Sequence, residues 1–194
     1  MILLIFCLVF SIYLASFKFL VFSDNFYKYE FSKGQENNLL TTKQIISFFE
    51  GNSELPDVFA KDEKYHLQDV KVLTQKGNIL LRLFILFNIV LLSFLLFNSD
   101  KIKKDLSRIS IFSGISGLLA ILPFILFDFS SLFMRFHLIF FPQGNWQFPA
   151  DSVLIQLFSE SFFYDAFIFV LVSSAIIFIF LIIFGALSSK VSSD

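Results

Sequence analysis

The stretch that decides the fold is 166–187, which reads AFIFVLVSSAIIFIFLIIFGAL and contains no charged residue. A helix that crosses a bilayer needs about 20 consecutive, predominantly apolar residues. Three further stretches meet this requirement, at 1–22, 79–97 and 109–127. We therefore predict a membrane α-helical protein with four transmembrane helices.

The composition of the whole chain agrees with a membrane protein. Its 194 residues are 56% hydrophobic and only 16% charged, whereas soluble domains carry about 25% charged residues. The net charge of -1 provides no basic surface, so we expect no nucleic-acid partner. The single cysteine, Cys7, excludes an internal disulfide, a cysteine-based zinc site and an iron–sulfur cluster. At this length we expect one integral membrane domain over 1–194.

The first apolar stretch could in principle be a cleaved signal peptide. It lacks a basic N-terminal region, and its apolar part exceeds the roughly 7–15 residues of such peptides. We therefore predict that 1–22 is retained as a helix.

The loop between the second and third apolar stretches predicts the orientation. Residues 98–108 contain Lys101, Lys103, Lys104 and Arg108 against two acidic residues. Short loops rich in lysine and arginine stay on the cytoplasmic side. The loops 23–77 and 128–165 are then outside the cell, and both termini are cytoplasmic.

The first outer loop shows signs of regular structure. Tyr27, Tyr29 and Phe31 alternate with polar residues, which favours a short strand. A helix is expected from Thr42 to Phe49, closed by a glycine, and a second one over 62–77. We therefore expect a small extracytoplasmic α+β element between the first two transmembrane helices.

The second outer loop is expected to be structured but irregular. Pro142, Gly144 and Pro149 interrupt regular structure, and the aromatic residues beside them favour the bilayer interface. Within this segment Trp146 is either an interface anchor or a platform for substrate.

Both histidines of the chain, His66 and His137, lie in the outer loops. In the helix predicted over 62–77, His66 and Asp69 share a face with two apolar residues. Either histidine alone could be an ordinary polar residue, but the pair places all imidazole chemistry on one side of the membrane.

Three further charged residues lie near the predicted membrane boundary. Asp128 follows the third apolar stretch, and Glu160 precedes the fourth, where a negative charge favours a helix N-terminus. Arg82 lies near the start of the second stretch. It could extend to the interface or pair with Asp128 or Glu160.

Two separate motifs resemble a known family. Residues 65–71, YHLQDVK, resemble the HxxDVK signature of the DUF1461 integral membrane proteins. The second signature is similar to 136–141, 144–146, 154–155 and 160–163, with Ser159 standing where a proline is expected. Together with the four-helix layout, the resemblance covers essentially the whole chain.

This resemblance implies an acyltransferase of the bacterial cytoplasmic membrane with its active site on the extracytoplasmic side. The implied partners are a diacylated lipoprotein and membrane lipid, and neither a cofactor nor a metal is implied. The implied reaction moves the sn-2 acyl chain of a diacylglyceryl lipoprotein onto the α-amino group of its N-terminal cysteine, which yields the lyso form. By motif position, His66 and His137 are the expected essential residues.

The residues accommodate such chemistry in more than one way. We expect His137 to deprotonate the attacking amine, while Asp69 orients His66 and Asp128 is a weaker candidate partner for His137. The oxyanion would be stabilised by the second histidine, by Arg82, or by N–H groups near Gly144 and Asn145. Alternatively, one histidine attacks the ester and forms an acyl-imidazole.

Two other classes of function remain open at this point. His66, His137 and Asp69 have the composition of a metal site with two histidines and one carboxylate. A small membrane protein without enzymatic activity is equally compatible with the residues alone.

Overall fold

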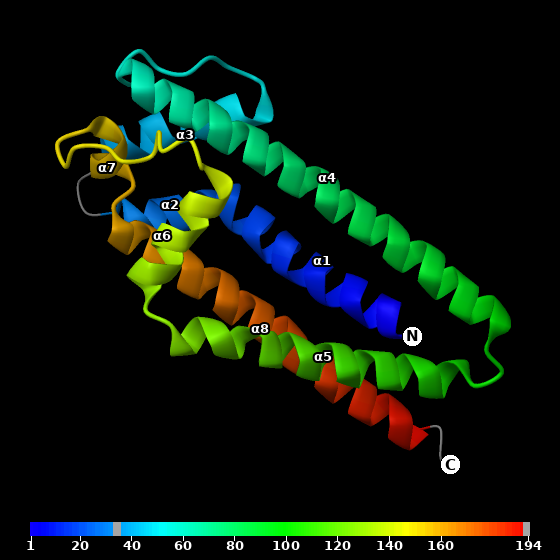
Figure 1. Ribbon diagram of the computed structural model, residues 1–194. Coiled ribbons are helices and arrows are strands. Elements are labelled where there is room, and N and C mark those ends of the chain that lie inside the picture. Colours follow the sequence, from blue (N-terminus) through cyan, green and yellow to red (C-terminus); the bar gives the residue numbers. More distant parts are fainter. Residues whose placement is uncertain (33–35, 192–194) are drawn as a thin grey trace. The chain divides into compact units, whose positions relative to one another are not determined.

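The computed structural model describes residues 1–32 and 36–191, and this part of the chain is helical without any strand (Figure 1). Four helices are long and apolar enough to cross a membrane. The eight helices of the described residues are α1 (Ile2–Val21), α2 (Asp24–Glu30), α3 (Glu36–Glu50), α4 (Lys61–Asn98), α5 (Ile102–Leu126), α6 (Phe129–Phe140), α7 (Val153–Leu157) and α8 (Glu160–Val191).

The chain forms two compact units. The membrane unit comprises 1–17, 78–126 and 169–194, and the histidine unit comprises 18–77 and 127–168. Both histidines belong to the second unit. The expectation of one integral membrane domain therefore stays a prediction, and each unit is described by itself.

Helices α4 and α8 extend beyond the apolar stretches predicted to span the membrane. Stretch 79–97 lies within α4, and stretch 166–187 lies within α8. The cytoplasmic side predicted for 98–108 stays a prediction. Most of that segment is helical, because α4 ends at Asn98 and α5 begins at Ile102.

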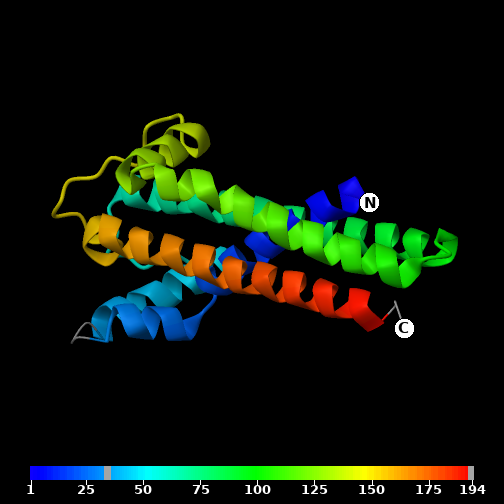
Figure 2. The ribbon, with the colours of Figure 1, turned by 90° about the horizontal axis from the view of Figure 1, so that it is seen from below.

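In the membrane unit, α5 and α8 run antiparallel in close contact (Figure 2). The Ser107 hydroxyl donates a hydrogen bond of 2.7 Å to the carbonyl oxygen of Gly185. A Cβ atom on Gly117 would overlap the ring of Phe178, which is fully buried. Small residues thus allow the two backbones to approach, as is common between membrane helices.

Helix α1 is joined to its neighbours in the same unit by two polar contacts. The Tyr13 hydroxyl donates to the carbonyl oxygen of Gly117 at 2.7 Å, and the Asn88 amide donates to the Ser11 hydroxyl at 2.9 Å. Such bonds satisfy polar groups that would be costly to leave unpaired in hydrocarbon.

The predicted α+β element is wrong, because the described residues of the first outer loop are helical. Of the residues predicted to form the strand, Tyr27 and Tyr29 belong to α2 and Phe31 is its C-cap, and Ser23 caps the start of this helix by accepting the backbone N–H of Phe26. Tyr27 and Phe31 are buried against the ring of Phe162, whereas Tyr29 is 77% exposed. Positions i and i+4 share a face in a helix as well as in a strand, so the alternation alone misled the prediction.

The following helix also begins earlier than expected. Helix α3 starts at Glu36, and Thr42 lies inside it with its side chain almost fully buried. The predicted closure by Gly51 agrees with the structure. Gly51 has a φ of 86°, a value typical of the glycine that ends a helix.

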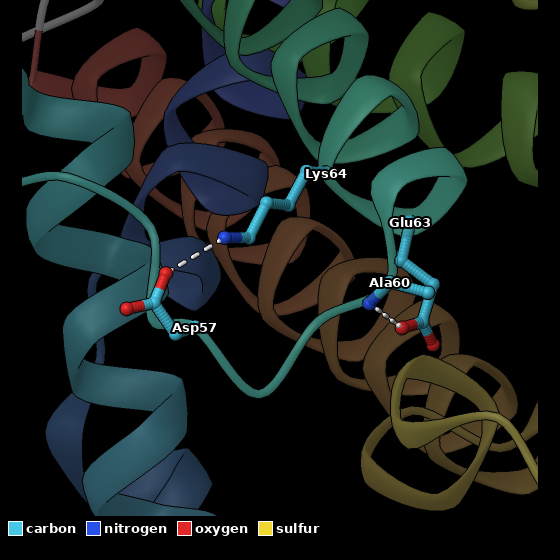
Figure 3. Close-up of polar contacts among 4 residues, drawn as sticks. All are labelled: Asp57, Ala60, Glu63 and Lys64. Atoms are coloured by element: carbon cyan, nitrogen blue, oxygen red, sulfur yellow. Dashed lines mark hydrogen bonds and ion pairs between the residues drawn. The ribbon is translucent and has the colours of Figure 1, made fainter.

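Helix α4 starts with a hydrogen bond from the backbone to a side chain (Figure 3). The Glu63 carboxylate accepts the backbone N–H of Ala60 at 2.7 Å, as in a capping box, and Lys64 pairs with Asp57 at 3.0 Å. The prediction that this helix ends at Gly77 is wrong. No proline follows Gly77, and a single glycine inside a long helix costs only about 1 kcal/mol.

The apolar core of the histidine unit lies around the start of α4. Its buried members come from α3, from the segment before α4, from α4 and from α7, namely Ile45, Phe59, Leu67, Leu154 and Leu157. Because Leu67 is the neighbour of His66, this core holds the first turns of α4 in place.

The second outer loop is more regular than expected. Helix α6 includes His137 and ends at Phe140, and Asp128 caps it by accepting the backbone N–H of Ser131 at 3.0 Å. The helix stops before Pro142, because a proline disfavours helical geometry in the residue before it. Ser159, the departure from the family pattern, accepts the N–H of Phe162 at the start of α8.

Candidate active site

His66 of α4 and His137 of α6 lie side by side in the histidine unit. Their ring centroids are 6.3 Å apart with an interplanar angle of 23°, and their exposed fractions are only 7% and 8%. The structure therefore brings together the two histidines that the sequence singled out, although 70 positions separate them in the chain.

Aromatic side chains surround both imidazoles. Phe141 and Phe148 lie 4.7 Å and 5.6 Å from the ring of His66, measured between centroids. Trp146 lies 4.8 Å from the ring of His137. Such apolar surroundings exclude water and strengthen any polar interaction formed inside them.

Burial keeps both histidines neutral at pH 7. The pKa of His66 is lowered to about 4, first by desolvation and then by the nearby His137, against the opposing effects of the Asp69 carboxylate and the Asn145 amide. Burial also lowers the pKa of His137, against the effect of its hydrogen bond to the backbone. A neutral imidazole has a free lone pair, which a general base requires.

The backbone determines which nitrogen of His137 is free. Its Nδ1 lies 2.8 Å from the carbonyl oxygen of Phe133, one turn earlier in α6. Since a carbonyl can only accept, Nδ1 must carry the proton. The lone pair of neutral His137 is therefore on Nε2.

Asp69 has a different set of partners from the one expected. Its Oδ2 accepts hydrogen bonds from the side-chain amides of Gln143 at 2.9 Å and Asn145 at 2.6 Å. The carboxylate thus anchors the segment after α6 to α4, and it acts on His66 only through its charge.

A glycine shapes the anchored segment. Gly144 has a φ of 78°, a backbone conformation that residues with a Cβ rarely adopt. It separates Gln143 from Asn145, which both reach Asp69, while the next residue, Trp146, contacts His137. The predicted site residues Asn145 and Trp146 therefore lie with the histidines.

Glu63 is a buried carboxylate that the sequence prediction missed. Its side chain accepts the backbone N–H of Leu154 at 2.8 Å in addition to that of Ala60. It therefore joins the start of α4, one turn before His66, to the start of α7. The spacing from Ala60 to Glu63 matches a capping box and could have revealed the first contact, but no sequence signal indicates the second.

The remaining predicted residues hold other positions. Asp128 caps α6 nine residues before His137, or about 13 Å along a helix, so it is not a partner of that imidazole. Glu160 accepts a hydrogen bond from Ser130 in the first turn of α6. Arg82 belongs to the membrane unit, and its pairing with Asp128 or Glu160 stays a prediction.

The geometry does not favour the alternative of a metal centre. Among the residues that the structure describes, no group of three or more histidine, cysteine or acidic side chains is arranged to hold a metal ion. Asp69 is engaged by two amides, and Nδ1 of His137 is engaged by a carbonyl.

Comparisons with known proteins agree with one another. A family model described as "Lipoprotein intramolecular transacylase Lit" matches residues 1–163. No curated protein sequence matches significantly.

The fold of this chain is similar to that of solved structures of a membrane protein. A structure of the membrane integral lipoprotein intramolecular transacylase Lit from Bacillus cereus superimposes with a TM-score of 0.80 at 18% identity, covering 99% of this chain and 95% of that one. A variant of that protein with a histidine-to-alanine substitution gives 0.81 at 17% identity, covering 99% and 93%. At such identity the likeness establishes the fold, that of a multi-pass membrane protein.

Proposed function

The chain belongs to the lipoprotein intramolecular transacylase family, whose members are membrane acyltransferases, and we propose that it converts diacylglyceryl lipoproteins to the lyso form. In this reaction the sn-2 acyl chain moves from the glyceryl group to the α-amino group of the N-terminal cysteine of the same molecule. The site faces the extracytoplasmic side of a bacterial cytoplasmic membrane. No cofactor is needed, because an ester is exchanged for an amide.

The observation that carries this proposal is the buried, neutral histidine pair among aromatic side chains. Aminolysis of an ester needs a proton acceptor that is unprotonated at neutral pH. It also benefits from a site that excludes water, because water would hydrolyse the ester. Holding amine and ester together on one substrate molecule supplies a large part of the rate.

The proposed reaction has a balanced proton inventory. The amine nitrogen attacks the ester carbonyl carbon, and Nε2 of His137 takes one amine proton. The tetrahedral intermediate then collapses as the bond to the sn-2 oxygen breaks. That oxygen receives the proton that Nε2 of His137 took from the amine, so that the products are an N-acyl amide and a free glyceryl hydroxyl, and His137 is neutral again.

His66 serves as the second group in this scheme. Its ring lies 6.3 Å from that of His137, close enough for the two imidazoles to contact opposite sides of one reacting centre. An N–H of its neutral ring donates a hydrogen bond to the departing glyceryl oxygen. The variant in which a histidine forms an acyl-imidazole uses the same free Nε2 of His137 and differs in predicting a covalent acyl-enzyme.

The test is tandem mass spectrometry of a lipoprotein N-terminal peptide. The host produces diacylglyceryl lipoproteins but cannot N-acylate them, and it receives the wild type, the His137→Ala variant or an empty vector. The total mass is unchanged by an intramolecular transfer, so fragment ions must locate the acyl chain. We expect the acyl group on the α-amine with the wild type only.

The same experiment addresses the function without catalysis. An unchanged diacylglyceryl peptide, with the wild type verified in the membrane, contradicts the proposed activity. Acyl transfer by wild type and His137→Ala at equal rates would instead retain the activity and remove His137 from the mechanism.

A further inference from the structure

Three buried polar atoms beside the histidine pair make no hydrogen bond of good geometry within the described residues, although the Asn145 amide lies close enough to His66 to raise the pKa of its imidazole. They are Nδ1 of His66, Oδ1 of Asn145 and Nε1 of Trp146. A buried polar atom that lacks a partner costs about 1–3 kcal/mol. Their concentration around one reacting centre indicates that a ligand with matching polar groups would remove this cost.

The side-chain orientation of Asn145 follows from its contact with Asp69. An ionised carboxylate can only accept hydrogen bonds, so the Asn145 nitrogen must face Asp69 at 2.6 Å. Oxygen Oδ1 is then the atom left over, and it is an acceptor. Through its side chain Asn145 therefore offers the site an acceptor, Oδ1, while one N–H of its amide is held by Asp69.

Trp146 offers the opposite polarity. An indole N–H is a donor only, and the ring lies 4.8 Å from the ring of His137, measured between centroids. The adjacent residues Asn145 and Trp146 thus present one acceptor and one donor to the same pair of imidazoles.

We propose that Asn145 Oδ1 accepts an N–H of the attacking amine and that the Trp146 indole N–H donates to the ester oxygen as it becomes the oxyanion. This assignment rests on the proposed function and adds two residues to it. The attacking amine carries two N–H groups: one goes to Nε2 of His137, and the second needs an acceptor. The developing negative charge needs a donor, which a neutral indole supplies without ionising.

The Asp69 contact orients the segment that carries both atoms. Asp69 holds that segment through Gln143 and Asn145 and thereby fixes which way the Asn145 amide faces. Both unpartnered atoms are buried, so a ligand reaches them only from within the site. Asp69 is in this sense a positioning residue.

The first arm of the test removes the indole N–H with Trp146→Phe. We expect kcat to fall roughly 100-fold, as for the loss of one oxyanion donor, with KM changed less than about twofold. The control is Gln147→Leu, which removes an exposed amide from the same segment and should leave both constants unchanged. Folding is checked by the melting temperature in detergent.

The second arm tests the acceptor with a changed substrate. A lipopeptide whose N-terminal amine is N-methylated has only one N–H to give, and the base takes it. Asn145→Leu should slow the natural substrate roughly 10-fold but add no further loss with the methylated one, as in a double-mutant cycle. A merely structural role of Asn145 would slow both substrates equally.

The outcomes separate the two levels of the proposal. A wild type that transfers no acyl chain contradicts the proposed function and the inference with it. An active wild type whose folded Trp146→Phe variant keeps its kcat within about twofold overturns the donor role. Equal slowing of both substrates by Asn145→Leu overturns the acceptor role. This second arm tests Asn145 even if the Trp146→Phe protein does not accumulate in the membrane.

Discussion

The membrane unit and the histidine unit differ in how their buried polar groups are arranged. In the membrane unit, Tyr13, Ser107 and Asn88 donate hydrogen bonds within 3 Å that join helices, while the unpartnered buried polar atoms belong to four different helices. In the histidine unit, His66 and its neighbours keep buried polar atoms without partners. The first arrangement stabilises the fold, whereas the second holds groups ready for a ligand.

The two units therefore differ in which property, stability or activity, depends on their side chains. Close helix packing around Phe178 depends on the absence of side chains at Gly114 and Gly117. The site depends on the presence of particular polar side chains at a few positions. Substitutions should therefore affect mainly stability in one unit and mainly activity in the other.

The strongest test of this comparison is replacement of the histidines. His66→Ala and His137→Ala should each lower kcat by a factor of about 100 or more, because proton transfer by a positioned group contributes that much. Rates of acyl transfer and melting temperatures in detergent are measured together. Tyr13→Phe is the contrasting variant in the membrane unit: it should lower the melting temperature through loss of the bond to Gly117 while kcat stays near the wild-type value. The comparison fails if the histidine variants lose stability rather than activity.

The next effect concerns glycines in the two units. Gly117→Ala should lower the free energy of unfolding by about 1–3 kcal/mol, because its Cβ would overlap the buried ring of Phe178. Thermal unfolding in a fixed detergent reports the change. Gly77→Ala is the matched control, since a Cβ there meets no atom within 4 Å, and it should raise stability by up to about 1 kcal/mol. Equal effects of the two substitutions would contradict the packing described here.

A smaller effect is expected at the start of α4. Glu63→Ala should cost about 1–3 kcal/mol, because it leaves the buried N–H of Leu154 unpaired. Lys64→Ala removes an adjacent ion pair with exposed Asp57 and should cost less than about 1 kcal/mol. Denaturation of both variants under one condition makes the comparison direct. A Glu63→Ala protein as stable as Lys64→Ala would show that the carboxylate does not hold α7.

The last expected effect is on the pH dependence of stability. The pKa of His66 is near 4 in the folded protein and near 6.5 when unfolded, so the unfolded state binds the proton first as the pH falls. Stability should be constant with pH above about 6.5 and decline between 6.5 and 4. Melting temperatures of the wild type and His66→Gln over this range measure the contribution. A decline of the same steepness in both proteins would assign it to other groups.

Much of the fold could be predicted from hydropathy. Stretches such as 166–187 must be helical in a membrane, because every backbone group there needs an internal partner. The same logic fails for amphipathic segments such as 27–31. There, positions i and i+4 share one face both in a strand and in a helix, so the pattern of apolar residues fits either structure. There the burial of Tyr27 against Phe162 decides for a helix.

The sequence predicted residues of the candidate site but not the hydrogen bonds that hold them. The sequence predicted His66 and His137 from their place in the outer loops and from the family motifs. It did not predict that Asp69 would hold Gln143 and Asn145, or that Glu63 would hold α7. Those bonds link residues more than 70 positions apart, and nothing local marks them.

The amino-acid sequence by itself determined that the chain is a helical membrane protein with both histidines outside its four long apolar stretches, because hydrophobic burial and helix formation depend on short-range composition. Only the tertiary structure decided which nitrogen of His137 is free and that Asn145 presents an acceptor. Hydrogen bonds are directional and need atoms within about 3 Å. Their partners are therefore known only once the backbone brings distant segments together.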